Sequence, residues 1–183
     1  MKVWTAEEIH KVMIDKGWWE WERNCGEIFA NIYSELSEAC DFLRGLAPRA
    51  QIIYEGEKPE GFLIEIVDCM IRVMDLFGHE GQDSEDYKTV EAWNKVFGKD
   101  GCWTEEVRIC LAMSHLGKAW NAYRSGEEFE GPNGYGLHLS TLLIELDYLC
   151  VNLKQNCNDL IDKKKSLKDS IDYGLENLSK IDG

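Results

Sequence analysis

Two pairs of carboxylates inside apolar helical stretches constrain the fold of this chain most strongly. Glu35 and Glu38 form one pair, and Glu65 and Asp68 form the other. Side chains three residues apart on a helix share one face, with Cβ atoms about 5–6 Å apart. Because an uncompensated carboxylate is costly to bury, the two helices are expected to pack with their acids around a cation. A hard divalent ion such as Mg²⁺ prefers oxygen ligands, which predicts a metal-dependent enzyme.

The composition favours a cytoplasmic protein of the all-α class. The chain has 183 residues, a formal net charge of −14 and three prolines, and scarce proline favours helices. The negative charge argues against nucleic acid or an anionic membrane surface as a partner, since both attract clustered Lys and Arg. The apolar runs are too short to span a bilayer, and the N-terminus lacks the apolar core of a signal peptide. Seven cysteines without a CxxC pair favour reduced thiols.

Helical periodicity and capping signals predict seven helices. They are expected at residues 5–17, 22–44, 59–78, 83–97, 104–124, 137–156 and 162–178. Thr5 and Glu8 form a capping-box pattern at the start of the first helix, and Gly45 ends the second. Residues 46–57 are predicted to form a loop, and Pro59 suits the first turn of the third helix. The glycines of residues 98–101 mark a break between two halves.

The pattern of the first half recurs eighty residues later. A shift of eighty positions without a gap aligns Ser34, Leu36, Ala39 and Arg44 with Ser114, Leu116, Ala119 and Arg124, and Leu63–Glu65 with Leu143–Glu145. Agreement of two helices in one register, with connecting loops of equal length, predicts an internal duplication. We therefore expect two tandem units, residues 1–98 and 99–183, that pack as a pseudo-dimer in one helical bundle.

The same shift predicts that the second unit has lost the acidic site. The positions of the four acids are taken in that unit by His115, Lys118, Glu145 and Tyr148. We expect an ion pair between Lys118 and Glu145, in which the ammonium group stands where the metal would have been. His115 is a candidate phosphate contact from the second half, with a structural role as the alternative.

Three segments of the first half occur in an order that is similar to one known family. These segments are Lys16-Gly17-Trp18-Trp19, Ser34-Glu35-Leu36-Ser37-Glu38-Ala39 and the run from Pro59 to Asp68. Together they resemble the MazG-like nucleotide pyrophosphohydrolases of the all-α NTP pyrophosphatase superfamily, over residues 5–97. The resemblance implies hydrolysis of a nucleoside triphosphate, in ribo or deoxy form, to the monophosphate and pyrophosphate. Mg²⁺ is the implied cofactor, with Mn²⁺ as an alternative.

The resemblance also implies roles for individual residues. Glu35, Glu38, Glu65 and Asp68 match the family's metal-binding acids, and Glu35 and Glu38 are the candidates for catalysis. Glu35 is either a ligand or the residue that orients the attacking water.

Three further residues are candidates for substrate binding. Asn94 matches the end of the family's Lys-x-x-Tyr-Asn pattern, but Val90 stands at the Lys position and Lys88 lies two residues earlier. Trp18 is a candidate for stacking on the nucleobase, with closure of the core as the alternative.

Two other functions compete with the pyrophosphohydrolase. One is a catalytically silent helical protein that binds a nucleotide or metal, and the missing Lys at position 90 keeps this alternative open. The other is a structural helical protein with acidic faces, against which the four intact acids argue. The expected partners are the triphosphate substrate and, as a higher assembly, a second copy of the tandem chain.

Overall fold

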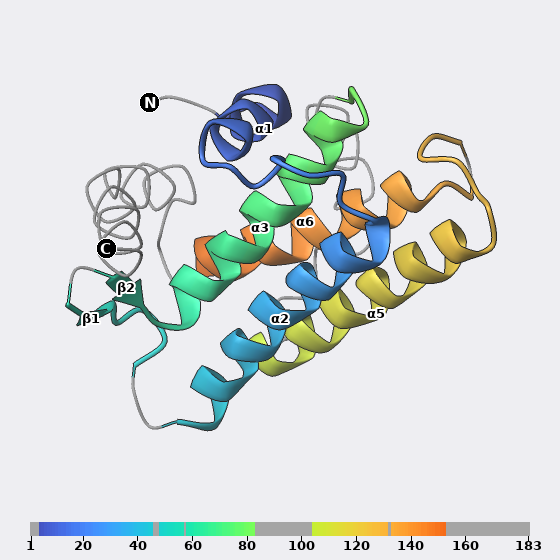
Figure 1. Cartoon of the computed structure of the whole chain (residues 1–183). Helices are drawn as coiled ribbons and strands as arrows, with labels where there is room; N and C mark the ends of the chain where they lie inside the picture. The colour runs from blue at the N-terminus through green and yellow to red at the C-terminus, as the bar shows by residue number, and fades with distance from the viewer. Residues whose placement is uncertain (1–3, 46–47, 57, 83–103, 132, 153–183) are drawn as a thin grey trace, which may run out of the picture.

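The computed structural model describes residues 4–45, 48–56, 58–82, 104–131 and 133–152 (Figure 1). Its helices are α1 (Ala6–Asp15), α2 (Cys25–Arg44), α3 (Phe62–His79), α5 (Glu105–Arg124) and α6 (Tyr135–Asn152). Two short strands, β1 (Ile53–Glu55) and β2 (Lys58–Glu60), pair as an antiparallel hairpin. The predicted all-α class is confirmed. The helices expected at 83–97 and 162–178, and the end of the one expected at 137–156, lie outside the described residues.

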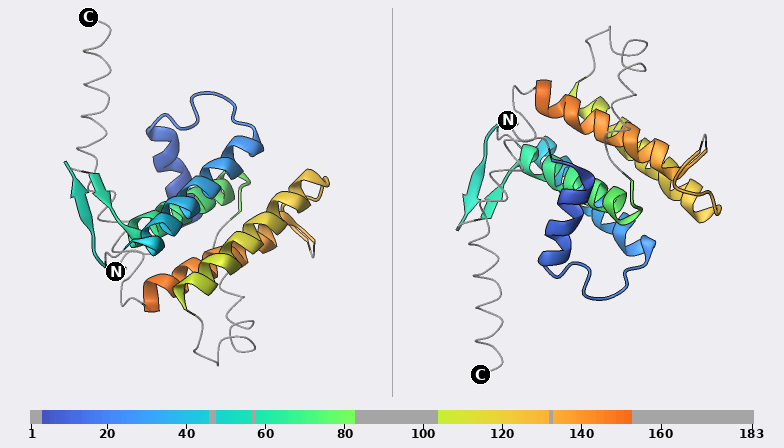
Figure 2. Two further views of the ribbon diagram at one scale, coloured as in Figure 1. Left: turned by 90° about the horizontal axis from the view of Figure 1, so that it is seen from below. Right: turned by 90° about the horizontal axis from the view of Figure 1, so that it is seen from above.

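The four longest of the described helices form one bundle around a shared apolar core. The helix α2 packs against α3 and α5, and α6 packs against α3 and α5, while α1 covers α3. Figure 2 shows the α2–α3 and α5–α6 hairpins as two layers. Fully buried side chains fill the interior from both layers, among them Ile32, Leu36, Ile66, Leu116, Leu139 and Leu142. The predicted boundary between two tandem units, at residues 98 and 99, lies outside the described ranges, so the pseudo-dimer stays a prediction.

Local signals in the sequence place most helix ends. The Thr5 side chain accepts a hydrogen bond from the Glu8 backbone N–H at 3.2 Å, and the Glu8 carboxylate accepts one from Thr5 at 3.2 Å, so the predicted capping box is confirmed. The second helix begins at Cys25 instead of residue 22, because the Asn24 side chain caps it by accepting from the Glu27 N–H at 3.0 Å. None of the described helices has the length and apolar character that a membrane span requires.

The prediction of a loop at residues 46–57 is wrong in its last part. Tyr54 pairs with Pro59 in the β1–β2 hairpin, so Pro59 lies in a strand and α3 begins later, at Phe62. Gly61 joins this strand to α3 with φ +135, and a Cβ atom there would lie 2.6 Å from the Gln51 carbonyl oxygen. Only glycine adopts this backbone conformation readily. Strands of three residues are too short to show an alternating pattern, which is why periodicity missed them.

The structure corrects the register of the predicted duplication. The helix α5 begins 80 residues after α2 and has the same 20-residue length, as predicted. The helix α6, however, begins 73 residues after α3, with which it shares a length of 18 residues. The connecting segments, 45–61 and 125–134, therefore differ in length, contrary to the expectation. The two offsets differ by about two helical turns, which keeps the apolar face unchanged and explains why the ungapped alignment looked plausible.

Candidate metal centre

The helices α2 and α3 face each other with a row of polar side chains on each. On α2 the row consists of Asn31, Glu35 and Glu38. On α3 it consists of Glu65, Asp68, Arg72 and Asp75. Because successive members are three or four residues apart, each row lies along one face of its helix. The apolar faces of the same helices enter the core, so packing of the bundle directs the two polar rows toward each other.

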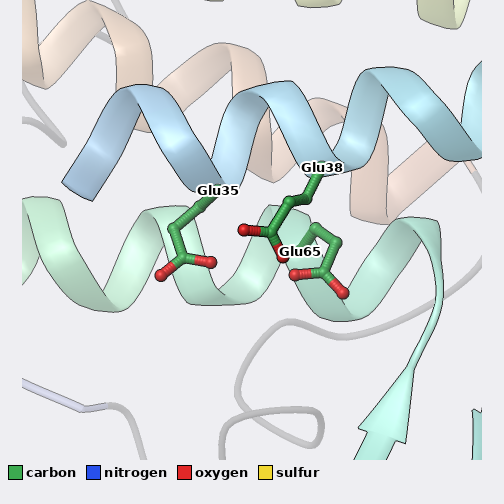
Figure 3. Close-up of side chains that lie close together, drawn as sticks. All are labelled: Glu35, Glu38 and Glu65. Atoms are coloured by element: carbon green, nitrogen blue, oxygen red, sulfur yellow. The ribbon is translucent and has the colours of Figure 1, made fainter. Parts of the chain in front are cut away.

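Three of the four predicted carboxylates converge between these rows. Glu35 and Glu38 from α2 and Glu65 from α3 each offer an oxygen, and these three atoms lie within 4.8 Å of one another (Figure 3). Glu65 is 2% exposed, Glu35 is partly buried and Glu38 is exposed. The carboxylate cluster, as we call these three residues, therefore opens to solvent on its Glu38 side. Its all-oxygen donor set suits a hard divalent cation.

Asp68 is not a member of the carboxylate cluster. It lies on α3 one turn beyond Glu65 and is partly exposed. The structure thus brings together three of the four acids that the sequence analysis assigned to a metal. The Ser34 hydroxyl donates to Glu38 Oε1 at 3.1 Å, which orients the most exposed carboxylate of the cluster.

Arg72 supplies a positive charge beside the cluster. Its Nε–H donates to Glu35 Oε1 at 3.2 Å, and the two side chains are 17% and 14% exposed. Burial lowers the pKa of Arg72, and the Glu35 carboxylate acts in the opposite direction. A role for this arginine was not predicted from the sequence, although its place four residues after Asp68, on the same helical face, was the available signal.

Trp18 lies beside the cluster with its ring already in contact with cations. The Arg72 guanidinium lies 3.5 Å from the centroid of the Trp18 ring, and that of Arg23 lies 4.9 Å from it. The half-buried indole also packs against the apolar core. Together with five other residues, Trp18 and Arg72 line a small pocket next to the carboxylate cluster; the others are Trp19, Arg23, Ile28, Asn31 and Asp75. The Trp18 ring thus packs against the core and is also a candidate for contact with a bound ligand.

The buried Asp75 anchors the N-terminal segment on α3. It is 7% exposed, and its carboxylate is 2.7 Å from His10 Nδ1 and accepts from Trp19 Nε1 at 3.0 Å. Burial raises the pKa of Asp75, while the hydrogen bonds from His10 and Trp19 lower it. His79 stacks on Trp19 with ring centroids 4.2 Å apart. This network, which was not predicted from the sequence, holds Trp19 in place.

The expected ion pair between Lys118 and Glu145 is wrong. Glu145 instead accepts a hydrogen bond from Arg108 at 3.0 Å, and the Arg108 guanidinium lies 4.6 Å from the centroid of the Tyr148 ring. Burial raises the pKa of Glu145, and Arg108 counteracts this. The cause is the register of α6, which places Glu145 about two turns away from the position that an ungapped duplication assigns to it.

The remaining substrate-binding candidates, Lys88 and Asn94, lie outside the described residues.

Comparison of the chain with known protein families, with curated proteins and with solved structures found no match. The fold and site define a four-helix bundle with a carboxylate cluster between two neighbouring helices. The similarity to MazG-like enzymes therefore rests on the sequence segments themselves.

Proposed function

We propose that this protein is a metal-dependent nucleoside triphosphate pyrophosphohydrolase of the MazG-like type. The convergence of Glu35, Glu38 and Glu65 from two helices carries the proposal. Carboxylates this close repel one another strongly, and the buried position of Glu65 increases that cost. A bound divalent cation would offset the repulsion. Beside the cluster, Arg72, Arg23 and the Trp18 ring contact one another and supply cationic and aromatic groups of the kind that bind a nucleotide.

The three clustered carboxylates would hold the metal, with Mg²⁺ as the first candidate and Mn²⁺ as the alternative. Asp68, one turn further along α3, is a fourth candidate ligand. A bound metal would neutralise the triphosphate and polarise the phosphorus under attack. Arg72 binds Glu35 Oε1 and so limits the orientations of that carboxylate.

The roles of the other residues follow from their exposure and contacts. As the alternative to a role as metal ligand, Glu35 would orient a water for attack on the α-phosphorus and accept its proton, while the bond from that phosphorus to the pyrophosphate oxygen breaks. Glu38, at the solvent side of the cluster, would meet the incoming triphosphate. Arg23 and Arg72 would contact its anionic groups, with Trp18 beside them.

Pyrophosphate release is the direct test of the proposed function. The protein is incubated with Mg²⁺ and a panel of ribo- and deoxyribonucleoside triphosphates, and pyrophosphate and monophosphate are quantified. Glu38→Gln should lower the rate by at least about a hundredfold, because it removes a charged group that acts on the metal and the transition state. Glu27→Gln is the matched control, since Glu27 is an exposed acid in the first turn of the same helix. Undiminished pyrophosphate release by Glu38→Gln would contradict the site.

One observation favours the alternative of a catalytically silent binding protein. The guanidinium of Arg72 already neutralises one acid of the cluster, Glu35. A protein of this kind would bind Mg²⁺ or a nucleotide in calorimetry and release no pyrophosphate from any triphosphate in the panel. That pair of results would replace the enzymatic proposal.

A further inference from the structure

The helix bounds identify the second hairpin's counterpart of the carboxylate cluster. With α5 offset by 80 residues from α2 and α6 by 73 residues from α3, each clustered carboxylate acquires a structural equivalent. The three equivalents carry imidazole or ammonium groups instead of carboxylates; they are His115, Lys118 and His138. This correspondence differs from the ungapped alignment, which pairs the third carboxylate with Glu145.

The two histidine rings among these equivalents lie near each other, and the charge of Lys118 acts on both. The rings of His115 and His138 have centroids 6.4 Å apart. Burial lowers the pKa of His115 to about 4, and the charges of Lys118 and His138 act in the same direction. Burial and Lys118 likewise lower the pKa of His138. The second hairpin thus carries one ammonium group and two imidazole rings of lowered pKa at the positions of the three clustered carboxylates.

One atom of this group is unsatisfied. His115 Nδ1 is buried and has no hydrogen-bond partner among the residues that the structure describes. Burying an unpaired polar atom is unfavourable, and the exposed Lys118 ammonium adds a charged donor whose field reaches both rings. With Nδ1 enclosed, Nε2 is the ring nitrogen through which His115 would meet a ligand. Lys118 is exposed and His138 is partly exposed, so the group can be reached from solvent.

We propose that His115, Lys118 and His138 form a binding site for an oxyanion of the phosphate type. An oxyanion would compensate the Lys118 ammonium and accept hydrogen bonds from imidazole N–H groups, whereas the ammonium would repel a metal cation. The ligand is inorganic phosphate or pyrophosphate, or the phosphate of a nucleotide, since these share the same chemistry. The site lies on α5 and α6 and does not depend on the proposed function of the α2–α3 cluster.

The four histidines of the chain make this proposal testable by NMR. Their imidazole signals are assigned with one His→Asn variant each and followed in the full chain at neutral pH. Inorganic phosphate, pyrophosphate and a nucleoside monophosphate are titrated separately, at constant ionic strength in chloride and with EDTA. The signals of His115 and His138 should shift saturably and by more than those of His10 and His79, which contact residues of the α2–α3 pocket. Tighter binding of the monophosphate than of phosphate would identify a nucleotide as the source.

Two lysine variants complete the experiment. Lys118→Gln should weaken the affinity at least about tenfold, because it removes a charged hydrogen-bond donor. Lys11→Gln is the matched control, since Lys11 is an exposed lysine on α1, and its affinity should equal that of the unchanged protein. His138→Asn should weaken binding as well and serves as a second variant.

Three results would overturn the proposal. The first is a uniform, non-saturating shift of all four histidines, which reports a general effect of salt. The second is an affinity that neither Lys118→Gln nor His138→Asn changes. The third is saturation of the His115 and His138 signals by Zn²⁺ but not by phosphate, which would identify a metal site instead.

Discussion

Replacing Arg72 by methionine would test the partly buried ion pair beside the carboxylate cluster. Arg72 and Glu35 are 17% and 14% exposed and their Nε and Oε1 atoms are 3.2 Å apart. Methionine keeps most of the apolar stem of arginine, so the variant removes the charge with little loss of packing. It leaves Glu35 partly buried without the guanidinium, next to two further carboxylates.

The expected loss of stability can be worked out from this environment. Removing one partner of a buried ion pair typically costs about 3–5 kcal/mol, and the residual exposure of both side chains favours the lower end. The contact of Arg72 with the Trp18 ring contributes roughly a further 0.5–1 kcal/mol. We therefore expect the free energy of unfolding to fall by about 3–4 kcal/mol, or the melting temperature by roughly 6–15 °C.

Urea unfolding followed by circular dichroism would measure this loss. Arg44→Met is the matched control, because Arg44 pairs with Asp41 at 3.1 Å while both side chains are mostly exposed, and such pairs contribute about 1 kcal/mol or less. The double variant Glu35→Gln/Arg72→Met should be more stable than Arg72→Met alone, since it leaves no uncompensated charge at the pair. If the cluster binds Mg²⁺, millimolar Mg²⁺ should stabilise Arg72→Met. A loss no greater than that of the exposed control would refute the reasoning.

Four further predictions concern stability and can be checked by the same unfolding assay. Gly78→Ala should destabilise the protein by about 1–3 kcal/mol, because the new Cβ would collide with His10 and the α1 backbone. Gly117→Ala should instead stabilise it by about 0.5–1 kcal/mol, since its Cβ meets only an ordinary contact. His115 has its pKa lowered to about 4 from 6.5, so the unfolded chain binds its proton first and stability should fall between pH 6.5 and 4. His115→Asn should reduce this dependence of the free energy of unfolding on pH. A pH dependence identical to that of the unchanged protein would contradict the prediction. Thr5→Ala should cost about 1 kcal/mol through loss of the capping box.

Much of the local structure could be predicted because its causes are local. The side chains that cap α1 lie within three residues of the groups they bind, and the spacing of Glu35 and Glu38 places both on one face of α2 without knowledge of any other helix. The same reasoning assigned Glu65 to a buried helix. The exception among the short-range features is the hairpin at β1 and β2, whose strands are too short for periodicity to reveal.

The contacts between helices could not be obtained in this way. Spacing within a helix determines which face a side chain occupies, but not how far along the neighbouring helix that face meets its partner. A displacement of about two turns preserves the apolar stripe, so the ungapped alignment paired Glu145 with Lys118, whereas the folded chain pairs it with Arg108. Glu35 and Arg72, 37 residues apart, are another pair of this kind.

The sequence alone thus determined the all-α class, most helix bounds and the pairing of acids on one face of each helix, because helix formation and amphipathicity depend on neighbours along the chain. Tertiary structure alone decided that Glu35, Glu38 and Glu65 meet and that Asp68 is not part of the cluster. It also decided that His115, Lys118 and His138 are the counterparts of the three acids. The physical reason is that the relative sliding of packed helices is set by the whole core and by the length of the connections, which no single segment encodes.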